Sequence, residues 1–422
     1  MKKLVALFLA LTMMLSLAAA AGAEGTTLNV AWWGGQGRNA NFEAALALYE
    51  TEKGVAIETQ TTGFSDHVTS MSTAGASGDL PEMFMLQSSY MGNFIDGEML
   101  VDLYPYVESG ALDLSKVPEG VIATGVMDGK LYGICAGVNA PALVYNKTLM
   151  DEHGIEIKDG MTIDEFCLKA AEIYEKTGVK TAVTNWTTMI EYIARGLGHR
   201  MYENGVLGVD AAEDLKPYFA ILERGLAEGW LIDYSIVANA TDVAEQPLVT
   251  GAEPEFSSWC AFYYSNQVES LQNAAPEGVE LAITTWPTDN LAESNYLRQA
   301  MCWCISAQSE NIDEAVALLN WWTNSVDAQN CVAGEPGVPA NSEVATAITP
   351  ILSVASQKAF TYVTDVVTPA CAPANAPASA GFSEVDVLIS ELNEMVASGL
   401  MTADDAAAQL FEEGSAIMEA AN

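Results

Sequence analysis

Positively charged side chains are scarce in this chain of 422 residues. Lys and Arg number 17 against 56 Asp and Glu, so the formal net charge is −39. Nucleic-acid phosphates need clustered Lys and Arg, so this balance excludes a nucleic-acid partner. An anionic membrane surface or a highly anionic ligand is disfavoured for the same reason. Half of the residues are apolar, so the acidity belongs to the surface of a folded chain and does not signal disorder.

Common catalytic motifs are also missing. The histidines His67, His153 and His199 lie far apart and form no H-E-x-x-H pair, which argues against a zinc protease. The sequence contains no G-x-S-x-G elbow and no G-x-x-x-x-G-K-[ST] loop. We therefore expect no catalytic residue, no metal site and no cofactor. A carboxylate-pair hydrolase stays open, because 56 acids supply pairs throughout the chain.

Long apolar runs are confined to the first residues. Lys2 and Lys3 precede an apolar stretch at 4–17, and small residues then end in Ala21-Gly22-Ala23. This order is typical of a secretory signal, and the stretch is shorter than the roughly 20 residues of a membrane span. We expect a signal peptide over 1–23, cleavage after Ala23, and a soluble protein that is secreted, periplasmic or associated with the cell surface.

Cysteine is present in an odd number, so at least one thiol lies outside any pairing within the chain. Cys302 and Cys304 alternate in an apolar run of strand type, which would place both thiols on one face. We interpret the cysteines mainly as small buried apolar side chains, with disulfides or a metal or redox site as alternatives. The seven are Cys135, Cys167, Cys260, Cys302, Cys304, Cys331 and Cys371.

The N-terminal part alternates strand and helix patterns. Strands are predicted at 28–33, 55–60 and 82–86, and helices at 41–53 and 66–77. Repeated βα units favour a parallel sheet and an α/β fold. The length allows two or three lobes, and no linker separates independent domains, so we expect the chain to cross between lobes several times.

Four later helices are also predicted. Thr162 is placed to cap a helix over 163–175, because Asp164 and Glu165 occupy its first turn and Gly178 follows its end. Further helices are expected at 311–326 and 383–397 and from 402 onward, and the Pro/Ala-rich run at 369–377 is expected to be extended.

Several blocks together resemble one known family. Residues 128–134 (DGKLYGI) and 142–147 (ALVYNK) resemble the G-K-L-Y-G-I-P and L-x-Y-N-K blocks of extracellular solute-binding proteins of ABC importers. The resemblance is to the carbohydrate-binding branch, family 1, that includes maltose-binding protein. Cys135 stands where the family usually has proline. Further similar blocks follow in the same order at 76–84, 97–103, 315–322, 337–340 and 399–406.

The resemblance implies an α/β, two-lobed periplasmic-binding-protein-like fold with a hinge of several crossings and a ligand held between the lobes. Carried over to this chain, the N-terminal lobe comprises 24–136 plus 286–333. The C-terminal lobe comprises 137–285 plus 334–422. Ligand contacts with both lobes would favour a closed form, which a membrane permease recognises.

Sugar binding needs aromatic platforms beside polar side chains, because sugars present apolar C–H faces and a rim of hydroxyls. In the first lobe, Trp33 ends the first strand, and Arg38 and Asn39 follow on a glycine-rich loop. Asp66 is either a ligand contact or a helix N-cap, and Tyr90 follows the strand at 82–86. Each of these residues has packing or surface roles as its alternative.

In the second lobe, Trp186 and Trp259 are expected at strand ends, and Trp259 is the strongest candidate. Glu335 lies at a crossing between lobes and is a candidate hydroxyl partner. Trp286 is expected at the hinge, whereas Trp303, Trp321 and Trp322 fit core patterns. The predicted ligand-binding set is therefore Trp33, Arg38, Asn39, Asp66, Tyr90, Trp186, Trp259 and Glu335.

These observations predict a monomeric, non-enzymatic binding protein that captures a neutral sugar or oligosaccharide and delivers it to an ABC transporter permease. One alternative is the same fold with an amine, a polyol or another small solute as ligand. The other is a secreted glycoside hydrolase, which needs two carboxylates about 5–10 Å apart across its ligand.

Overall fold

A computed structural model describes residues 26–184, 186–203, 205–240, 242–299, 301–374 and 381–421. The predicted signal peptide and its cleavage site lie outside these residues. The chain forms two compact units and passes between them several times. Unit 1 comprises Met1–Val117, Gly125–Ala136 and Met301–Glu335, and unit 2 comprises Pro118–Thr124, Gly137–Ala300 and Pro336–Asn422.

The return to unit 1 comes later than the sequence suggested. Residues 286–300 were expected in the N-terminal lobe, yet the structure places them in unit 2. The physical reason is the burial of Trp286, which is 0% exposed in the unit 2 core and packs edge-on against Tyr192. Trp286 is therefore a core residue and not a hinge residue. Residues 118–124 also belong to unit 2.

Unit 1 is built on a five-stranded sheet with the order β2-β1-β3-β14-β6. β1 runs parallel to β2 and β3, which confirms the parallel βα pattern. β14 is antiparallel to both β3 and β6, so a late segment of the chain completes the sheet. The strands are β1 (Thr27–Trp33), β2 (Ala56–Thr62), β3 (Met83–Leu86), β6 (Ile134–Cys135) and β14 (Cys302–Ile305).

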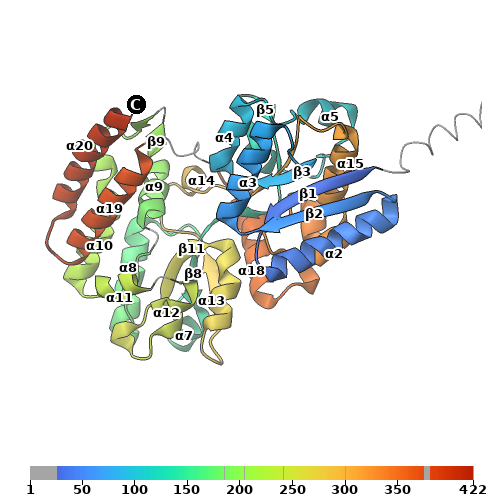
Figure 1. The fold of residues 1–422 in the computed structure, drawn as a ribbon. Coiled ribbons are helices and arrows are strands. Elements are labelled where there is room, and N and C mark those ends of the chain that lie inside the picture. The colour runs from blue at the N-terminus through green and yellow to red at the C-terminus, as the bar shows by residue number, and fades with distance from the viewer. Residues whose placement is uncertain are drawn as a thin grey trace, which may run out of the picture. The chain divides into compact units, whose positions relative to one another are not determined.

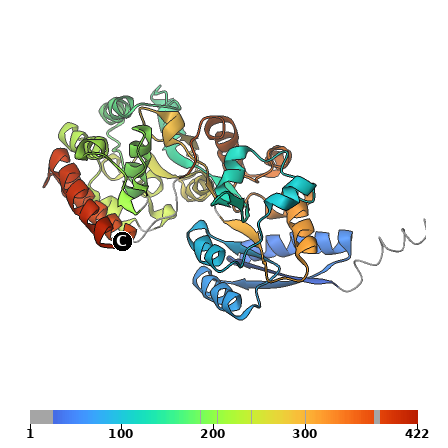
Figure 2. The same ribbon diagram turned by 90° about the horizontal axis from the view of Figure 1, so that it is seen from above.

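Helices cover both faces of this sheet (Figures 1 and 2). On one face, Trp32 and Trp303 pack against Phe42 of α2, and Trp303 also packs against Trp322 of α15. Because neighbouring side chains of a strand alternate, Trp33 contacts the opposite face, where α3 and α4 lie. The bounds are α2 (Gln36–Lys53), α3 (Phe64–Ser77), α4 (Ser88–Asp96), α15 (Ile312–Asn324) and α16 (Val326–Val332).

Helix α2 begins five residues before the predicted start. Gly35 is its N-cap residue and Gly54, in the left-handed region at φ 71°, ends it as expected. Arg38 and Asn39 consequently lie in the first turns of a helix and not on a loop. The remaining short elements of unit 1 are α5 (Tyr104–Ser109), β4 (Val126–Met127) and β5 (Lys130–Leu131).

Unit 2 contains an antiparallel sheet with the order β11-β8-β12. Its side chains alternate between two apolar clusters, because Leu143 of β8 packs into one and Val144 into the other. In the same way, Phe262 and Ala261 of β11 enter different clusters. The strands are β8 (Pro141–Asn146), β11 (Cys260–Tyr264) and β12 (Leu281–Thr284), and two short pairs are β7 (Val138–Asn139) with β13 (Arg298–Gln299) and β9 (Tyr202–Glu203) with β10 (Val206–Leu207).

The larger cluster is covered by long helices, including the two C-terminal ones (Figure 1). Helix α8 begins with the predicted cap, since Thr162 accepts from the Glu165 N–H while the Glu165 side chain accepts from the Thr162 N–H. Gly178 ends this helix. The helices are α8 (Ile163–Thr177), α9 (Trp186–Gly196), α10 (Lys216–Glu228), α19 (Phe382–Ala397) and α20 (Ala403–Ala421).

Shorter helices complete unit 2. Those packed near the smaller cluster include α13 and α18, whose Leu271, Ala355 and Ala359 are buried with Val144. The helices are α6 (Glu119–Ile122), α7 (Lys147–Glu152), α11 (Tyr234–Asn239), α12 (Pro247–Thr250), α13 (Val268–Ala274), α14 (Leu291–Ser294), α17 (Ser342–Ile348) and α18 (Val354–Thr361), which continues as a π-helical turn over Tyr362–Val367.

Five of the seven cysteines are buried, which confirms their interpretation as small core side chains. Cys302 and Cys304 share one sheet face, because a Cβ placed on Gly133 would lie 2.9 Å from Cys302 Cβ and 3.0 Å from Cys304 Sγ.

Among the residues described, no group of three or more His, Cys, Asp or Glu side chains is arranged to hold a metal ion. No helix in the same part of the chain has the length and apolarity to cross a membrane.

Candidate functional site

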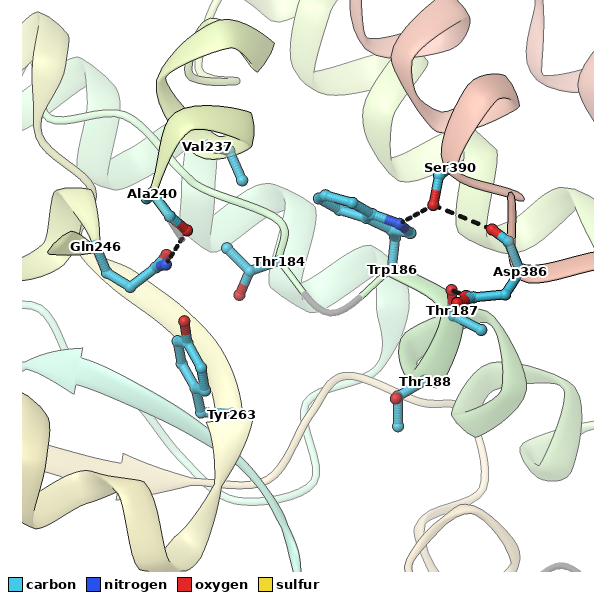
Figure 3. A pocket seen from close by; sticks show the side chains of 10 residues that line it. All are labelled: Thr184, Trp186, Thr187, Thr188, Val237, Ala240, Gln246, Tyr263, Asp386 and Ser390. Atoms are coloured by element: carbon cyan, nitrogen blue, oxygen red, sulfur yellow. Dashed lines mark hydrogen bonds between the residues drawn. The ribbon is translucent and has the colours of Figure 1, made fainter. Parts of the chain in front are cut away.

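A cavity of about 420 Å³ opens in unit 2 (Figure 3). Its size falls in the range of small-molecule sites, which span roughly 300–1,000 Å³. Side chains from α9, α11, β11 and α19 meet here, so distant parts of the sequence build it. The lining residues are Thr184, Trp186, Thr187, Thr188, Val237, Ala240, Gln246, Tyr263, Asp386 and Ser390.

Trp186 supplies an aromatic wall of the cavity. It is the first residue of α9, and its indole N–H donates to Ser390 Oγ at 2.9 Å. Ser390 in turn donates to the backbone carbonyl of Asp386 at 3.0 Å. This chain of hydrogen bonds fixes the indole edge against α19, so the plane of the ring is set before any ligand arrives.

Tyr263 provides a second aromatic side chain from β11. Figure 3 shows its hydroxyl directed toward the Gln246 amide. Burial and the nearby Asp242 raise the pKa of Tyr263 to about 12, although the adjacent Gln246 amide lowers it. The phenol is therefore neutral at physiological pH and can donate a hydrogen bond.

Two polar side chains are held in fixed orientations at the cavity wall. Thr187 donates its hydroxyl to Oδ1 of Asp386. Gln246 is 3% exposed, and its Nε2 donates to the carbonyls of Ala240 at 3.1 Å and Asp242 at 3.4 Å. Gln246 Oε1 is buried and has no hydrogen-bond partner among the described residues.

Unit 1 carries a separate aromatic cluster. The Trp33 ring lies 5.3 Å from Phe64 and 5.2 Å from His67, and Phe64 lies 5.9 Å from Tyr90. His67 Nε2 donates to the Met85 carbonyl at 2.8 Å, and burial lowers the pKa of His67 despite this bond. Phe64 is 37% exposed, so the cluster offers an accessible apolar face.

The predicted site residues thus separate into groups. Trp33 and Tyr90 come together in the unit 1 cluster, while Trp186 lines the unit 2 cavity. Asp66 is exposed in the first turn of α3, where Gly63 and not Asp66 is the N-cap. This position contradicts the capping alternative for Asp66 and leaves the ligand contact as an untested prediction.

Three predicted polar contacts are engaged within unit 1. Arg38 forms a two-pronged ion pair with Glu335, at 2.7 Å from Nε and 3.0 Å from Nη2. Asn39 Oδ1 accepts from the indole N–H of the buried Trp32 at 3.0 Å. These contacts give Arg38, Glu335 and Asn39 structural partners, so we leave them out of the candidate site.

Trp259 requires a correction. It was the strongest ligand candidate, yet it is 0% exposed, and its indole N–H donates to Thr181 Oγ1 at 2.8 Å. Its ring packs 5.8 Å from Phe166 in the unit 2 core. Trp259 precedes β11 and points into the core, so a ligand cannot reach its ring without unpacking this unit.

Several residues that line the cavity were not predicted from the sequence. Tyr263, Gln246 and Asp386 are separated by long stretches of chain, and none lies in a recognisable motif. Tyr263 lies in β11, and by strand alternation it points to the face opposite that of Phe262. Gln246 and Asp386 carried no comparable local signal.

Comparison with known proteins defines the class. A family model for bacterial extracellular solute-binding proteins matches residues 44–361, which is more than half of the chain. The chain therefore belongs to the family of bacterial extracellular solute-binding proteins. Solved structures confirm the two-lobed α/β fold of this class. An extracellular solute-binding protein of family 1 from Alicyclobacillus acidocaldarius has a TM-score of 0.83 at 22% identity, covering 93% of this chain and 98% of that one.

Two further similarities involve named sugar-binding proteins. A periplasmic oligogalacturonide-binding protein from Yersinia enterocolitica has a TM-score of 0.75 at 17% identity, covering 94% of this chain and all (100%) of that one. An arabinooligosaccharide-binding protein of Halalkalibacterium halodurans is 27% identical over 202 residues. That match covers 46% of this chain and 44% of the relative, so this chain spans less than half the length of that relative.

Proposed function

We propose that this protein binds a neutral sugar or oligosaccharide, with the unit 2 cavity as a sugar-contact site. The observation that carries this proposal is the Trp186 indole, fixed by Ser390 beside the polar Asp386 and Gln246. A flat aromatic face suits the C–H face of a sugar ring, while side-chain acceptors suit its hydroxyls. The unit 1 cluster of Trp33, Phe64 and Tyr90 is a second candidate sugar-contact surface.

The names of related proteins support a saccharide ligand. Both the Halalkalibacterium and the Yersinia relatives are named for oligosaccharides that they bind. We extend this ligand class to the present chain and propose that it delivers the sugar to the membrane permease of an ABC importer. We further propose a monomer.

The cavity supports binding without catalysis. Glycoside hydrolysis uses two carboxylates placed across the ligand. One carboxylate, Asp386, is present among the described residues that line the cavity. Incubation with nitrophenyl glycosides is therefore expected to release no nitrophenol, and measurable turnover would contradict this part of the proposal.

A thermal-shift screen tests the ligand class. Arabinobiose, xylobiose, galactobiose and maltose are added separately, together with simple amines and polyols. A sugar that binds only the native state raises Tm, by linkage, with its concentration. Stabilisation by amines alone would favour the alternative ligand class, and no response to any sugar would reject the proposal.

Trp186→Ala provides the site test. We expect at least about a tenfold loss of affinity for the sugar that stabilises the parent protein, because the fixed platform is removed. Trp321→Ala is the matched control, since Trp321 packs on Tyr49 and bonds to Glu52 in unit 1 and is not among the residues that line the cavity. Equal affinity in Trp186→Ala would exclude this cavity as the site.

Export and delivery have their own tests. We propose cleavage after Ala23, so N-terminal sequencing of the mature protein is expected to begin at Glu24. Cells that lack the protein are expected to lose uptake of the bound sugar at low external concentration. Normal uptake in such cells would argue against the transport role.

A further inference from the structure

The unit 2 cavity offers acceptors and negative charge to its ligand. Asp386 is the charged side chain among the described lining residues, and this lining contains no Lys, Arg or His. Thr187 occupies Oδ1 of Asp386, and no hydrogen bond within the described chain engages Oδ2. A carboxylate oxygen accepts hydrogen bonds and repels other anions.

Gln246 adds a second acceptor to the same wall. The orientation of its amide is set by its donor group, because Nε2 donates to the carbonyls of Ala240 and Asp242. The orientation is therefore fixed by two acceptors, and Oε1 remains the buried atom that lacks a partner. A buried acceptor without a hydrogen-bond partner costs free energy in the folded state.

Arg195 of α9 and Arg200, four residues beyond the end of this helix, do not offset this charge. Arg195 is buried and donates to the carbonyls of Ser294 at 3.0 Å and Pro373 at 2.9 Å. Arg200 Nη2 lies 3.7 Å from a carboxylate oxygen of Glu293. Both guanidinium groups therefore contact acceptors that do not line the cavity.

From these contacts we infer that Asp386 is a specificity-determining residue that excludes acidic sugars from the cavity. The inference rests on the proposed sugar-binding function and narrows its ligand class. A hydroxyl donor of a neutral sugar satisfies Asp386 Oδ2. A uronate would place its carboxylate near that of Asp386 with no cation among the described lining residues to balance the pair, and like charges brought together at an interface weaken binding.

This selectivity differs from that of one structural relative. The Yersinia protein is named for an oligogalacturonide, whose sugar units carry carboxylates. The two chains share the fold at 17% identity, so the fold alone leaves the charge of the ligand unspecified. The side chains at the cavity wall determine which ligand charge is accepted. In this chain the charged side chain among the described lining residues is the carboxylate of Asp386.

Galactobiose and digalacturonate test the inference, because they differ only in a neutral CH2OH group or a carboxylate at C6. Titration calorimetry measures both at neutral pH and constant ionic strength. We expect galactobiose to bind the unmodified protein at least about tenfold more tightly. Asp386→Asn keeps an oxygen for Thr187 and removes the charge, so the ratio of the two affinities is expected to fall about tenfold.

Glu391→Gln is the matched control. It removes one negative charge from an exposed position on the same helix α19, outside the lining of the cavity. The affinity ratio in this variant is expected to equal that of the unmodified protein, which separates a local effect from net charge. Urea unfolding of both variants checks that each one folds.

The outcomes separate the inference from the function on which it rests. Galactobiose bound no more tightly than digalacturonate would overturn the role of Asp386, as would an unchanged ratio in Asp386→Asn. If neutral sugars still stabilise the protein, the proposed function stands in that case. If no sugar of the panel stabilises the protein, both the proposed sugar-binding function and the role of Asp386 are rejected.

Discussion

Arg38 in α2 and Glu335 are 297 residues apart in sequence, yet their side chains form a two-pronged ion pair. Arg38 also donates to the Trp33 carbonyl at 2.9 Å. The pair therefore joins the end of β1 to the last residue that unit 1 contributes before the chain leaves it. Their positions, on a glycine-rich segment and at a crossing between lobes, predict ligand contacts for both residues, and the structure shows that each is the other's ion-pair partner.

Arg38→Lys tests this structural role. Lysine keeps the charge but loses the planar fork, so we expect a loss of about 1 kcal/mol in the free energy of unfolding. Glu335→Gln should cost a similar amount. Urea denaturation measures both variants, and sugar affinity should stay unchanged. A large loss of affinity at full stability would return Arg38 and Glu335 to the binding site.

Trp186 and Trp259 should respond differently to truncation. Trp259 is fully buried, so Trp259→Ala leaves a cavity and an unpaired Thr181, and we expect a loss of about 3–5 kcal/mol of stability. Trp186→Ala should mainly weaken sugar binding. Trp186→Phe retains a ring but removes the bond to Ser390. Its affinity for the sugar should therefore lie between that of the unmodified protein and that of Trp186→Ala. Denaturation and calorimetry on the same samples distinguish these effects.

Glu191 on α9 makes stability depend on pH. Burial raises its pKa to about 7 from 4.5, although Arg195 and Arg200 lower it. Between these values the folded state holds a proton that the unfolded chain has released, so stability falls as pH rises through this window. Each unit of pKa shift corresponds to about 1.4 kcal/mol.

Glu191→Gln should flatten this pH dependence. The amide stays neutral, so its unfolding free energy should vary less than that of the parent protein between about pH 4.5 and 7.5. Urea titrations across that range provide the measurement. Glu391→Gln is again a suitable control, because it makes the same substitution at an exposed position of α19. Parallel curves for parent and Glu191→Gln would contradict the assignment.

Thiol accessibility provides a further prediction. Cys331 and Cys371 are partly exposed, whereas the other five cysteines are buried. Burial raises the pKa of Cys260 and Cys302 well above the ordinary value, so their reactive thiolate is suppressed in the native state. A disulfide reagent at mildly alkaline pH should therefore modify two thiols at most in the folded protein. Modification of more would show that a buried cysteine is accessible.

The sequence predicts more of the fold than of the candidate site. Local signals were sufficient for α8, because Thr162, Glu165 and Gly178 mark its ends chemically. The start of α2 was missed since Gly35 and Gly37 read as loop residues, yet glycine also serves as an N-cap. The return to unit 1 was misplaced because the burial of Trp286 depends on partners distant in sequence.

The candidate site depends on tertiary packing even more. Trp259 and Trp186 are both predicted at strand ends, with Trp259 as the stronger candidate, but Trp259 faces the core and Trp186 starts a helix at the cavity. Strand alternation changes the face with each single residue, so a small error in register reverses such an assignment. Asp386 and Gln246 line the same cavity as Trp186 only after α19 and the segment before α12 have packed. No local sequence pattern predicts that these residues lie together.

The place of β14 in the unit 1 sheet sets an order of events during synthesis. β3 ends at Leu86 and its neighbour β14 begins at Cys302, so the strand between β3 and β6 is made last. At about 5–20 residues per second, the roughly 200 intervening residues take on the order of 10–40 s to emerge. Throughout that interval the edge of β3 has no final partner. The nascent N-terminal unit therefore stays incomplete until β14 has been made.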